Sequence, residues 1–167
     1  MATVKYAALL LLLLPCQLWA LAGDRDQPIE VEADELEVRE QEGISIYRGN
    51  VKLVQGSLEI NADRVVIHFN DANELTLMEM TGTPATLRQL DDNQQEMHGE
   101  AMQIDYSQTD SLLELRDSAR LSQAGDVIES DMIRINTQSN SLQAGSTKSD
   151  QRVKMLIQPK PDSPAVE

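Results

Sequence analysis

The sequence is poor in the residue types from which most active sites are built. Among 167 residues there is one cysteine, Cys16, and there are two histidines, His68 and His98, neither of which has a partner at metal-ligand spacing. Neither a G-x-S-x-G nucleophile elbow nor a glycine-rich phosphate loop occurs. This inventory argues against catalysis, so we expect no enzyme activity, no catalytic residue, no metal and no cofactor.

Aromatic residues are also scarce, at 3% of the chain. Downstream of residue 22 the aromatic residues are Tyr47, Phe69 and Tyr106, and the other large apolar positions hold Ile, Leu, Val and Met. A β-protein usually fills its centre with larger rings. A slim, flexible lining fits two interpretations, a dry core or a groove that admits acyl chains, and composition alone does not choose between them.

Positive charge is in short supply as well. The formal net charge is −14 at pH 7, and no basic stripe runs along the chain. A protein this acidic repels nucleic acid, so we exclude DNA and RNA as partners.

The N-terminal segment has the features of an export signal. Lys5 is followed by an unbroken apolar run over residues 7–14, and Ala20-Leu21-Ala22 forms a small-x-small cleavage site. The run is too short to span a bilayer, which needs about 20 apolar residues. We therefore predict a cleaved signal peptide over residues 1–22. Cys16 leaves with it, so no disulfide supports the mature fold.

The remaining chain has the length of one domain, which we place at residues 23–158. Residues 159–167 contain three prolines and no apolar periodicity, so we predict a disordered tail there. Within the domain, apolar and polar residues alternate in short runs separated by Gly, Asn, Asp and Ser, as in residues 44–47 and 75–78. This pattern predicts an all-β fold with antiparallel strands joined by hairpins.

A repeat organises these strands. A small residue and an acid followed by alternating apolar residues occurs four times, beginning at Ala33-Asp34, Ala62-Asp63, Gly99-Glu100 and Ser130-Asp131. Before each copy the apolar residues occupy every second position, and after it they occupy the alternate positions. In the second copy, for example, they change from even numbers, such as Ile60, to odd numbers, such as Val65. Because side chains alternate faces with a period of two, an unbroken strand would turn its apolar set outward at that point. We therefore predict a β-bulge or corner at each copy, with the acid accepting backbone hydrogen bonds that the broken ladder frees.

Several segments resemble a known family. These are Asp26-Gln27-Pro28-Ile29, Gly49-Asn50-Val51, residues 55–66, Gly82-Thr83-Pro84-Ala85-Thr86 and Gly99-Glu100-Ala101. Together they resemble the LptA family, the OstA-like periplasmic proteins of lipopolysaccharide transport, and the resemblance extends from about Asp24 to Ile157. It implies a twisted antiparallel β-jellyroll shaped like an open V-shaped trough, which the four strand-turn-strand repeats would build.

The resemblance also implies a function. The protein would act in the periplasm as a lipopolysaccharide carrier that shields the acyl chains of lipid A, and it would join end to end with related domains. Its partners would be an LptC-like inner-membrane protein, an LptD-like outer-membrane protein and further copies of itself. Because the lipid phosphates and the protein are both anionic, we expect the phosphates to stay outside the trough.

The alternation of apolar residues along each strand, combined with the implied fold, indicates which residues are functional. We expect lipid contact at the inward-facing positions Ile29, Val31, Leu36, Val38, Ile46, Leu58, Ile60, Val65, Ile67, Leu87, Met102, Ile104 and Tyr106. The docking edges should be the terminal strands, which carry Ile29, Val31, Val153, Met155 and Ile157.

Two other functions stay open at this point. The first is an LptC-like relative that shares the fold but keeps its N-terminal anchor, against which the cleavage site at residues 20–22 argues. The second is a structural adaptor that links envelope proteins through its edges and carries no lipid.

Overall fold

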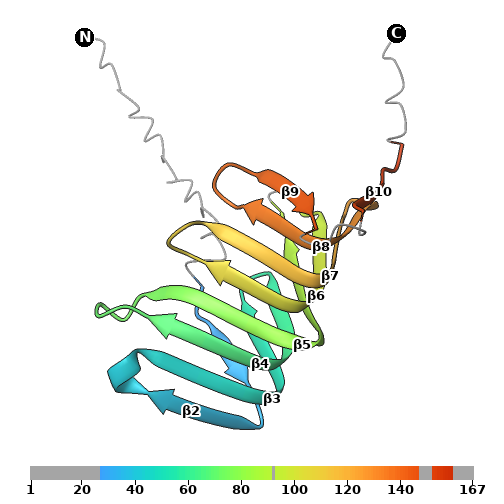
Figure 1. Ribbon diagram of the computed structural model, residues 1–167. Helices are drawn as coiled ribbons and strands as arrows, with labels where there is room; N and C mark the ends of the chain where they lie inside the picture. Colours follow the sequence, from blue (N-terminus) through green and yellow to red (C-terminus); the bar gives the residue numbers. More distant parts are fainter. Residues whose placement is uncertain (1–26, 92, 147–151, 160–167) are drawn as a thin grey trace, which may run out of the picture.

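The computed structural model describes residues 27–91, 93–146 and 152–159, which fold into one open antiparallel sheet (Figure 1). The strand order is β1-β3-β4-β5-β6-β7-β8-β10, with β2 also beside β3 and β9 also beside β8. This confirms the predicted all-β antiparallel fold. The elements are β1 (Glu30–Glu32), β2 (Glu35–Arg39), the short 3-10 helix η2 (Glu40–Glu42), β3 (Ile44–Gln55), β4 (Leu58–Phe69), β5 (Leu75–Leu90), β6 (Glu96–Ser107), β7 (Leu112–Gln123), β8 (Asp126–Asn136), β9 (Ser141–Gly145) and β10 (Lys154–Leu156).

Some of the expected boundaries lie beyond this part of the chain. The predicted signal peptide, residues 1–22, and residues 160–167 of the predicted tail are outside the described residues, so both stay predictions. Within the described ranges, no helix is long and apolar enough to cross a membrane.

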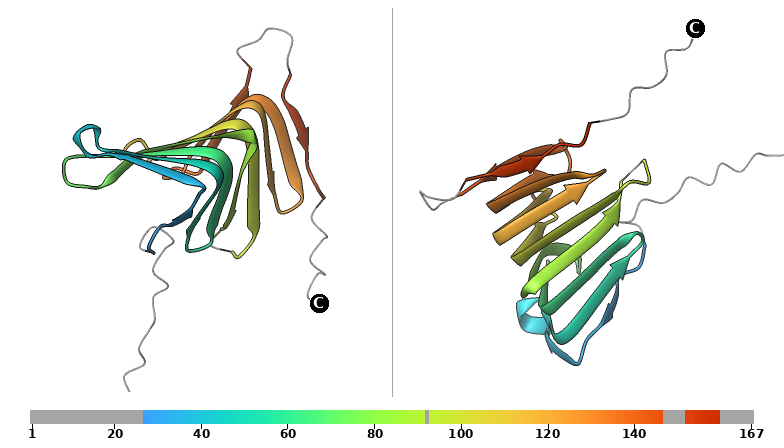
Figure 2. Two further views of the ribbon diagram at one scale, coloured as in Figure 1. Left: turned by 90° about the horizontal axis from the view of Figure 1, so that it is seen from below. Right: turned by 90° about the vertical axis from the view of Figure 1, so that its right-hand side faces the viewer.

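The sheet is folded into a V, and its long strands run through both arms (Figure 2, left). We call the arm bounded by β1 and β10 blade 1 and the arm bounded by β2 and β9 blade 2. Between these edges, blade 1 contains residues 51–55, 58–61, 86–90, 96–100, 120–123 and 126–129, and blade 2 contains residues 44–48, 64–69, 75–81, 103–107, 112–116 and 132–136.

The strands lose their regular register where they cross from one blade to the other. Ladder pairing skips from Arg48 to Val51 in β3, and equivalent shifts follow in every neighbouring long strand. The extra residues bend the strand and reset which face its side chains occupy. The V therefore results from a row of irregularities aligned across the sheet.

These irregularities test the four predicted corners. Ala62-Asp63 falls within the shift of β4, Asp131 within that of β8, and Ala33-Asp34 in the gap between β1 and β2, so three corners are confirmed. The remaining corner, predicted at Gly99-Glu100, was placed two residues early. Gly99 and Glu100 still pair normally, and the register shift of β6 lies at Ala101-Met102.

The acids at the three confirmed corners accept hydrogen bonds from side chains, whereas we expected backbone donors. Asp131 accepts one from the Ser146 hydroxyl at 3.3 Å. The Asn50 amide donates to Asp34 at 2.8 Å, and the Thr83 hydroxyl donates to Asp63 at 3.3 Å. Both donors lie at register shifts of the neighbouring strand, so each bond ties two bulges together across the bend.

Small side chains line the inside of the bend. Ala62, Ala85, Ala101 and Ala119 are at most 8% exposed and pair in register with one another or with Val51 and Ser130. Larger side chains would not fit there, because the inner faces of the two blades converge at this line.

Gly99 lies where the two blades pack closely against each other. A methyl group on its α-carbon would lie 3.1 Å from Leu115 Cδ2 in blade 2 and 3.2 Å from Leu87 Cγ in blade 1. Gly99→Val should therefore lower the free energy of unfolding by about 2 kcal/mol through overpacking. Urea unfolding would measure the change, with Gly145→Val as the control because nothing lies within 4 Å of its position. Equal losses in both variants would contradict this account of Gly99.

Register also fixes which residues share the inner face. One row across blade 2 runs Leu36, Tyr47, Val65, Met80, Ile104, Leu115, Ile133 and Ala144, and a row across blade 1 runs Val31, Leu53, Ile60, Leu87, Gly99, Leu121, Ile128 and Met155. Most of these side chains belong to a single hydrophobic core between the blades.

Candidate lipid-binding groove

A groove of about 700 Å³ opens between the free margins of the two blades. Its apolar wall comes mostly from alternate residues of six strands, β4 to β9, because the side chains of each strand alternate between the two faces of the sheet. The apolar lining residues are Leu58, Ile60, Met78, Met80, Leu87, Leu90, Met97, Tyr106, Leu113, Leu121, Ile135 and Leu142. Its volume is in the range of ordinary small-molecule sites, about 300–1,000 Å³.

A second hollow continues the groove toward the C-terminal end. It measures about 380 Å³ and shares Leu121, Gln123 and Leu142 with the first. From there it extends to Met155 of β10 and to Pro159. The two hollows together therefore extend to the β10 edge of the sheet.

The lining is flexible as well as apolar. Three methionines and several branched aliphatic side chains contribute to it, and Tyr106 is the single aromatic residue among the described residues that line it. Methionine has three rotatable bonds and a polarizable sulfur, so it adapts to irregular apolar ligands. This wall can accommodate chains of variable length and packing more easily than one built from rigid rings.

The structure brings most of the predicted lipid-contact residues to the concave side. Leu58, Ile60, Leu87 and Tyr106 line the groove itself. Val65, Ile67 and Ile104 share that face but lie deeper, at most 2% exposed within the core. The remaining concave residues, Val31, Leu36 and Val38, lie in the two edge strands at the N-terminal end, and Ile29 immediately precedes β1.

Two of the expected inward positions are wrong. Ile46 is 3% exposed, but it pairs with Glu37 and Val66 on the convex face, opposite to its neighbour Tyr47. Met102 is 42% exposed because it lies in the register shift of β6, where the strand bends outward. Neither side chain lines the groove.

Sequence reasoning also missed part of the wall. Most of the missed residues come from β5 and β7, the strands that carry no copy of the repeat: Met78, Met80, Leu90, Leu113 and Leu121. The others, Met97, Ile135 and Leu142, come from β6, β8 and β9. The four copies of the repeat lie in the β1–β2 pair, β4, β6 and β8. One period of the repeat therefore spans two long strands, and only one of the two carries the motif. The alternation of Leu113 with Leu115, and of Met78 with Met80, was the available signal.

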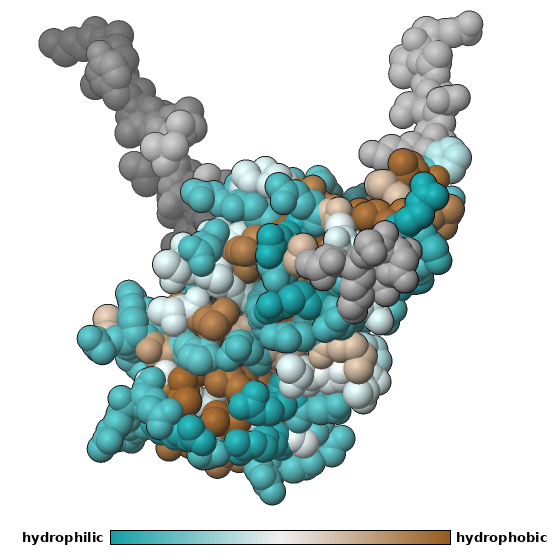
Figure 3. All heavy atoms as spheres, viewed as in Figure 1, coloured by the Kyte–Doolittle hydropathy of each residue, from teal (hydrophilic) through white to brown (hydrophobic). Residues whose placement is uncertain are grey.

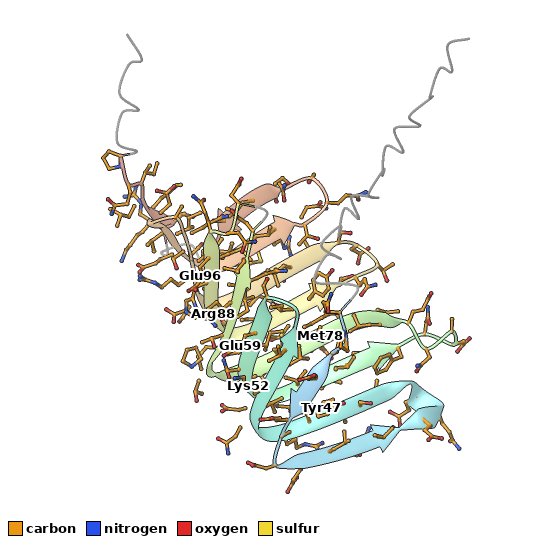
Figure 4. All side chains as sticks on the ribbon, turned by 180° about the vertical axis from the view of Figure 1, so that it is seen from behind. Tyr47, Lys52, Glu59, Met78, Arg88 and Glu96 are labelled. Atoms are coloured by element: carbon orange, nitrogen blue, oxygen red, sulfur yellow. The ribbon has the colours of Figure 1, made fainter. Side chains whose placement is uncertain are left out.

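The convex face is charged and held by ion pairs across neighbouring strands. On blade 1, Glu59 lies 3.7 Å from both Lys52 and Arg88, and Arg88 reaches Glu96 at 3.4 Å (Figure 4). On blade 2, Glu37 of β2 contacts Arg48 of the neighbouring β3 at 3.0 Å, and Arg39 of its own strand at 2.6 Å. The convex face of blade 2, turned toward the viewer in Figure 3, is mostly hydrophilic.

These contacts shift the titration of two carboxylates. Hydrogen bonds from Arg39 and Arg48 lower the pKa of Glu37 below its usual value of 4.5. A hydrogen bond from Asn61 and the nearby charge of Lys52 lower the pKa of Glu59. Both groups are more acidic in the folded chain than in the unfolded chain, so they stabilise the fold at neutral pH.

Acid should remove this contribution. A carboxyl group whose pKa is lower in the folded chain than in the unfolded chain stabilises the fold at pH values above its pKa in the unfolded chain. This stabilisation is lost as the pH falls through its pKa in the folded chain. We therefore expect the urea midpoint to fall once the pH drops below about 4.5, the usual value for Glu37. Glu37→Gln should lose less stability over that range than the unsubstituted chain. An identical acid profile for both proteins would contradict this role of Glu37.

The sequence and the structure were then compared with known proteins. Residues 30–141 match the family model described as LptA/(LptD N-terminal domain) LPS transport protein. The chain belongs to the LptA family of lipopolysaccharide transport proteins.

Individual relatives agree with this family. The chain is 31% identical to the lipopolysaccharide export system protein LptH of Pseudomonas aeruginosa, over 84% of this chain and 85% of that protein. It is also 31% identical to the export protein LptA of Escherichia coli K12, over 83% and 76% of the two chains. The crystal structure of P. aeruginosa LptH, titled as a periplasmic component of the lipopolysaccharide transport device, superposes with a TM-score of 0.75 at 29% identity and covers 83% and 100% of the two chains.

In this LptA-family chain, exposed apolar side chains gather at the two ends of the sheet. Leu36 and Val38 of β2 are 57% and 55% exposed at the N-terminal end. Met155 of β10 is 57% exposed at the other end, where hydrophobic side chains are visible in Figure 3. The predicted edge residues Ile29, Val153 and Ile157 flank β1 and β10 and are also exposed, whereas Val31 packs on the core.

Sequence reasoning missed one of these edges. β9 borders blade 2 at the C-terminal end, as β10 borders blade 1, and its Leu142 is 40% exposed. Each end of the V therefore presents two edge strands, β1 with β2 and β9 with β10. An unpaired strand edge offers backbone groups to a strand of another chain.

Proposed function

We propose that this chain carries lipopolysaccharide across the periplasm, holding the acyl chains of lipid A in the groove between its blades. The observation that carries this proposal is the groove of about 700 Å³, walled by aliphatic and methionine side chains, in a member of a lipopolysaccharide transport family. Relatives in this family are transport proteins, and the groove has the physical character that such a cargo needs.

The energetic reason for a groove is the cost of exposing acyl chains. Each methylene group transferred from water to an apolar surrounding gains about 0.8 kcal/mol. An open trough covers the chains only in part, so the lipid stays shielded and can still move along it. The convex charged face keeps the loaded carrier in solution.

End-to-end docking would extend the trough from one membrane to the other. We assign the N-terminal edges β1 and β2 and the C-terminal edges β9 and β10 to contacts with an LptC-like inner-membrane protein, an LptD-like outer-membrane protein or further copies of this chain. The support is the exposed apolar side chains at both ends and the second hollow, which leads the groove to the C-terminal edge.

Lysine substitutions on one edge strand should block this docking without preventing lipid binding in the groove. Charged side chains on an edge strand oppose pairing with another strand. Leu36→Lys combined with Val38→Lys should therefore abolish association through the N-terminal end in sedimentation and pull-down measurements. Lipopolysaccharide binding by the monomer should persist, and Met102→Lys serves as the control. Unimpaired association of the double variant would contradict the docking role of β2.

Photo-crosslinking tests the cargo. A photoreactive residue at Leu58 or Met97 faces the groove, whereas one at Met102 lies on the outside of the bend. Irradiation with purified lipopolysaccharide should label the chain from Leu58 and Met97 and leave the Met102 derivative unlabelled. Absence of labelling from both groove positions, or equal labelling from all three, would contradict the proposal.

Two simpler observations separate the alternatives. An LptC-like anchored relative would retain its first residues, so an N-terminus near Gly23 in the exported protein would exclude it. A structural adaptor without cargo would keep the same melting temperature when lipopolysaccharide is added. A carrier should melt higher, because a ligand that binds only the folded state stabilises it.

A further inference from the structure

The polar margin of the groove is built almost entirely from uncharged side chains. Besides its apolar wall, the groove is lined by Gln55, Gln89, Asn93, Gln123, Thr137 and Asn140, with Asp91 as the only charged residue in its described lining. The second hollow adds Gln95, Gln158 and one further acid, Asp126. Among the described residues that line either hollow, none is Lys, Arg or His.

The single charge of the main groove is held as an anion. Asp91 accepts hydrogen bonds from the backbone N–H groups of Asn93 and Gln95, both at 2.8 Å, and from the Gln123 amide at 2.9 Å. These bonds lower the pKa of the Asp91 carboxyl, with the bond from Gln95 as the largest cause. Asp91 therefore remains negatively charged at neutral pH.

The cations of the sheet lie on the other side. Register places every Lys and Arg of the strands on the convex face, and many of them are paired with acids there. They are Arg39, Arg48, Lys52, Arg64, Arg88, Arg116, Arg120, Arg134 and Lys154. Arg120, for example, contacts Glu129 at 2.6 Å, and Arg134 contacts the buried Glu114.

A phosphate at the groove margin would thus meet amides, hydroxyls and carboxylates. We infer that the groove selects its cargo by the acyl chains alone and binds a dephosphorylated multi-acyl glycolipid at least as well as the phosphorylated lipid. This inference rests on the proposed function. It adds that the anionic headgroup contributes nothing favourable to affinity and that neutral glycolipids belong to the same substrate class.

The test compares two lipids that differ only in phosphate. Lipid A and the same molecule stripped of its phosphates would compete with a fluorescent acyl probe for the purified mature chain, at low and high salt. We expect the dephosphorylated lipid to bind within about three-fold of lipid A or more tightly. Affinity for lipid A should hold or increase with salt, because salt screens its repulsion from the acidic margin.

The outcomes separate this inference from the proposed function. If lipid A binds about ten-fold more tightly at low salt and loses that advantage at high salt, the inference is wrong and the carrier role stands. If neither lipid displaces the probe, the carrier role fails and the inference falls with it.

A variant that gains a cation tests where the headgroup lies. Asn93 is exposed at the groove margin, so Asn93→Lys places a positive charge where the described lining of the groove has none. This variant should acquire a preference of about three-fold for the phosphorylated lipid at low salt. Gln41→Lys, in the exposed η2 helix away from the groove, is the matched control and should acquire none. An unchanged preference in Asn93→Lys would overturn the placement of the headgroup at this margin.

Discussion

Leu115→Ala is expected to lower the free energy of unfolding by about 3 kcal/mol. Leu115 is fully buried, pairs with Ile104 and Ile133 on the inner face, and reaches across the bend to the backbone of Gly99. Shortening it leaves a cavity at the point where the two blades meet. Urea or thermal unfolding of the purified chain measures the loss.

A matched leucine on the same inner row provides the control. Leu36 belongs to the edge strand β2 and is 57% exposed, so Leu36→Ala should cost well under 1 kcal/mol. If the two substitutions had similar effects, the core would not lie between the blades as described.

Leu142→Glu is expected to weaken lipopolysaccharide binding about fifty-fold, which corresponds to about 2–3 kcal/mol. Leu142 lies at the junction of the two hollows and is 40% exposed in the free protein, so a carboxylate there is hydrated and should leave the fold intact. Acyl chains that fill the groove would strip water from that carboxylate, and burying an unpaired charge is costly.

Met102→Glu is the matched control for this effect. Met102 has almost the same exposed fraction, 42%, but lies on the outside of the bend. Its substitution adds the same charge and should leave lipid affinity within about two-fold. Equal weakening by both variants would mean that net charge, rather than the groove, governs binding.

The repeat in the sequence predicted local bends in the strands. At Ala62-Asp63 the apolar parity changes, and only a local irregularity can then keep both halves of the strand facing inward. The structure confirms that irregularity in β4 and in β8. The sequence could not show that these corners align into one crease, because alignment depends on pairing between strands that are distant in the chain.

The position of Ile46 could not be predicted from the alternation of apolar and polar residues in β3. β3 carries Ile44 and Ile46 on one face and Tyr47, Val51 and Leu53 on the other, so both faces look apolar in the sequence. The hairpin register of β2 with β3 decides between them, and it pairs Ile46 with Glu37. That register depends on the short helix η2 and on Gly43, which adopts a positive φ of 64°.

The sequence predicted that the candidate site has an apolar lining, but it identified only some of the residues that form this lining. Four of the expected lipid-contact residues line the groove, while every contribution of β5 and β7 except Leu87 was missed, because those strands carry no copy of the repeat. Composition left a dry core and an open groove as equal interpretations. A groove exists because the blades touch at the small residues of the bend and diverge toward their margins, which is a property of the whole sheet.

The most direct test of the central claim is a measurement of contacts between acyl chains and isoleucine methyl groups by intermolecular nuclear Overhauser effects. Ile60 and Ile135 line the groove, and Ile46 lies on the convex face of the same sheet. With lipopolysaccharide bound to the methyl-labelled mature chain, we predict cross-peaks from acyl methylene protons to Ile60 and Ile135 and none to Ile46. Cross-peaks to Ile46 without any to Ile60 or Ile135 would contradict the account.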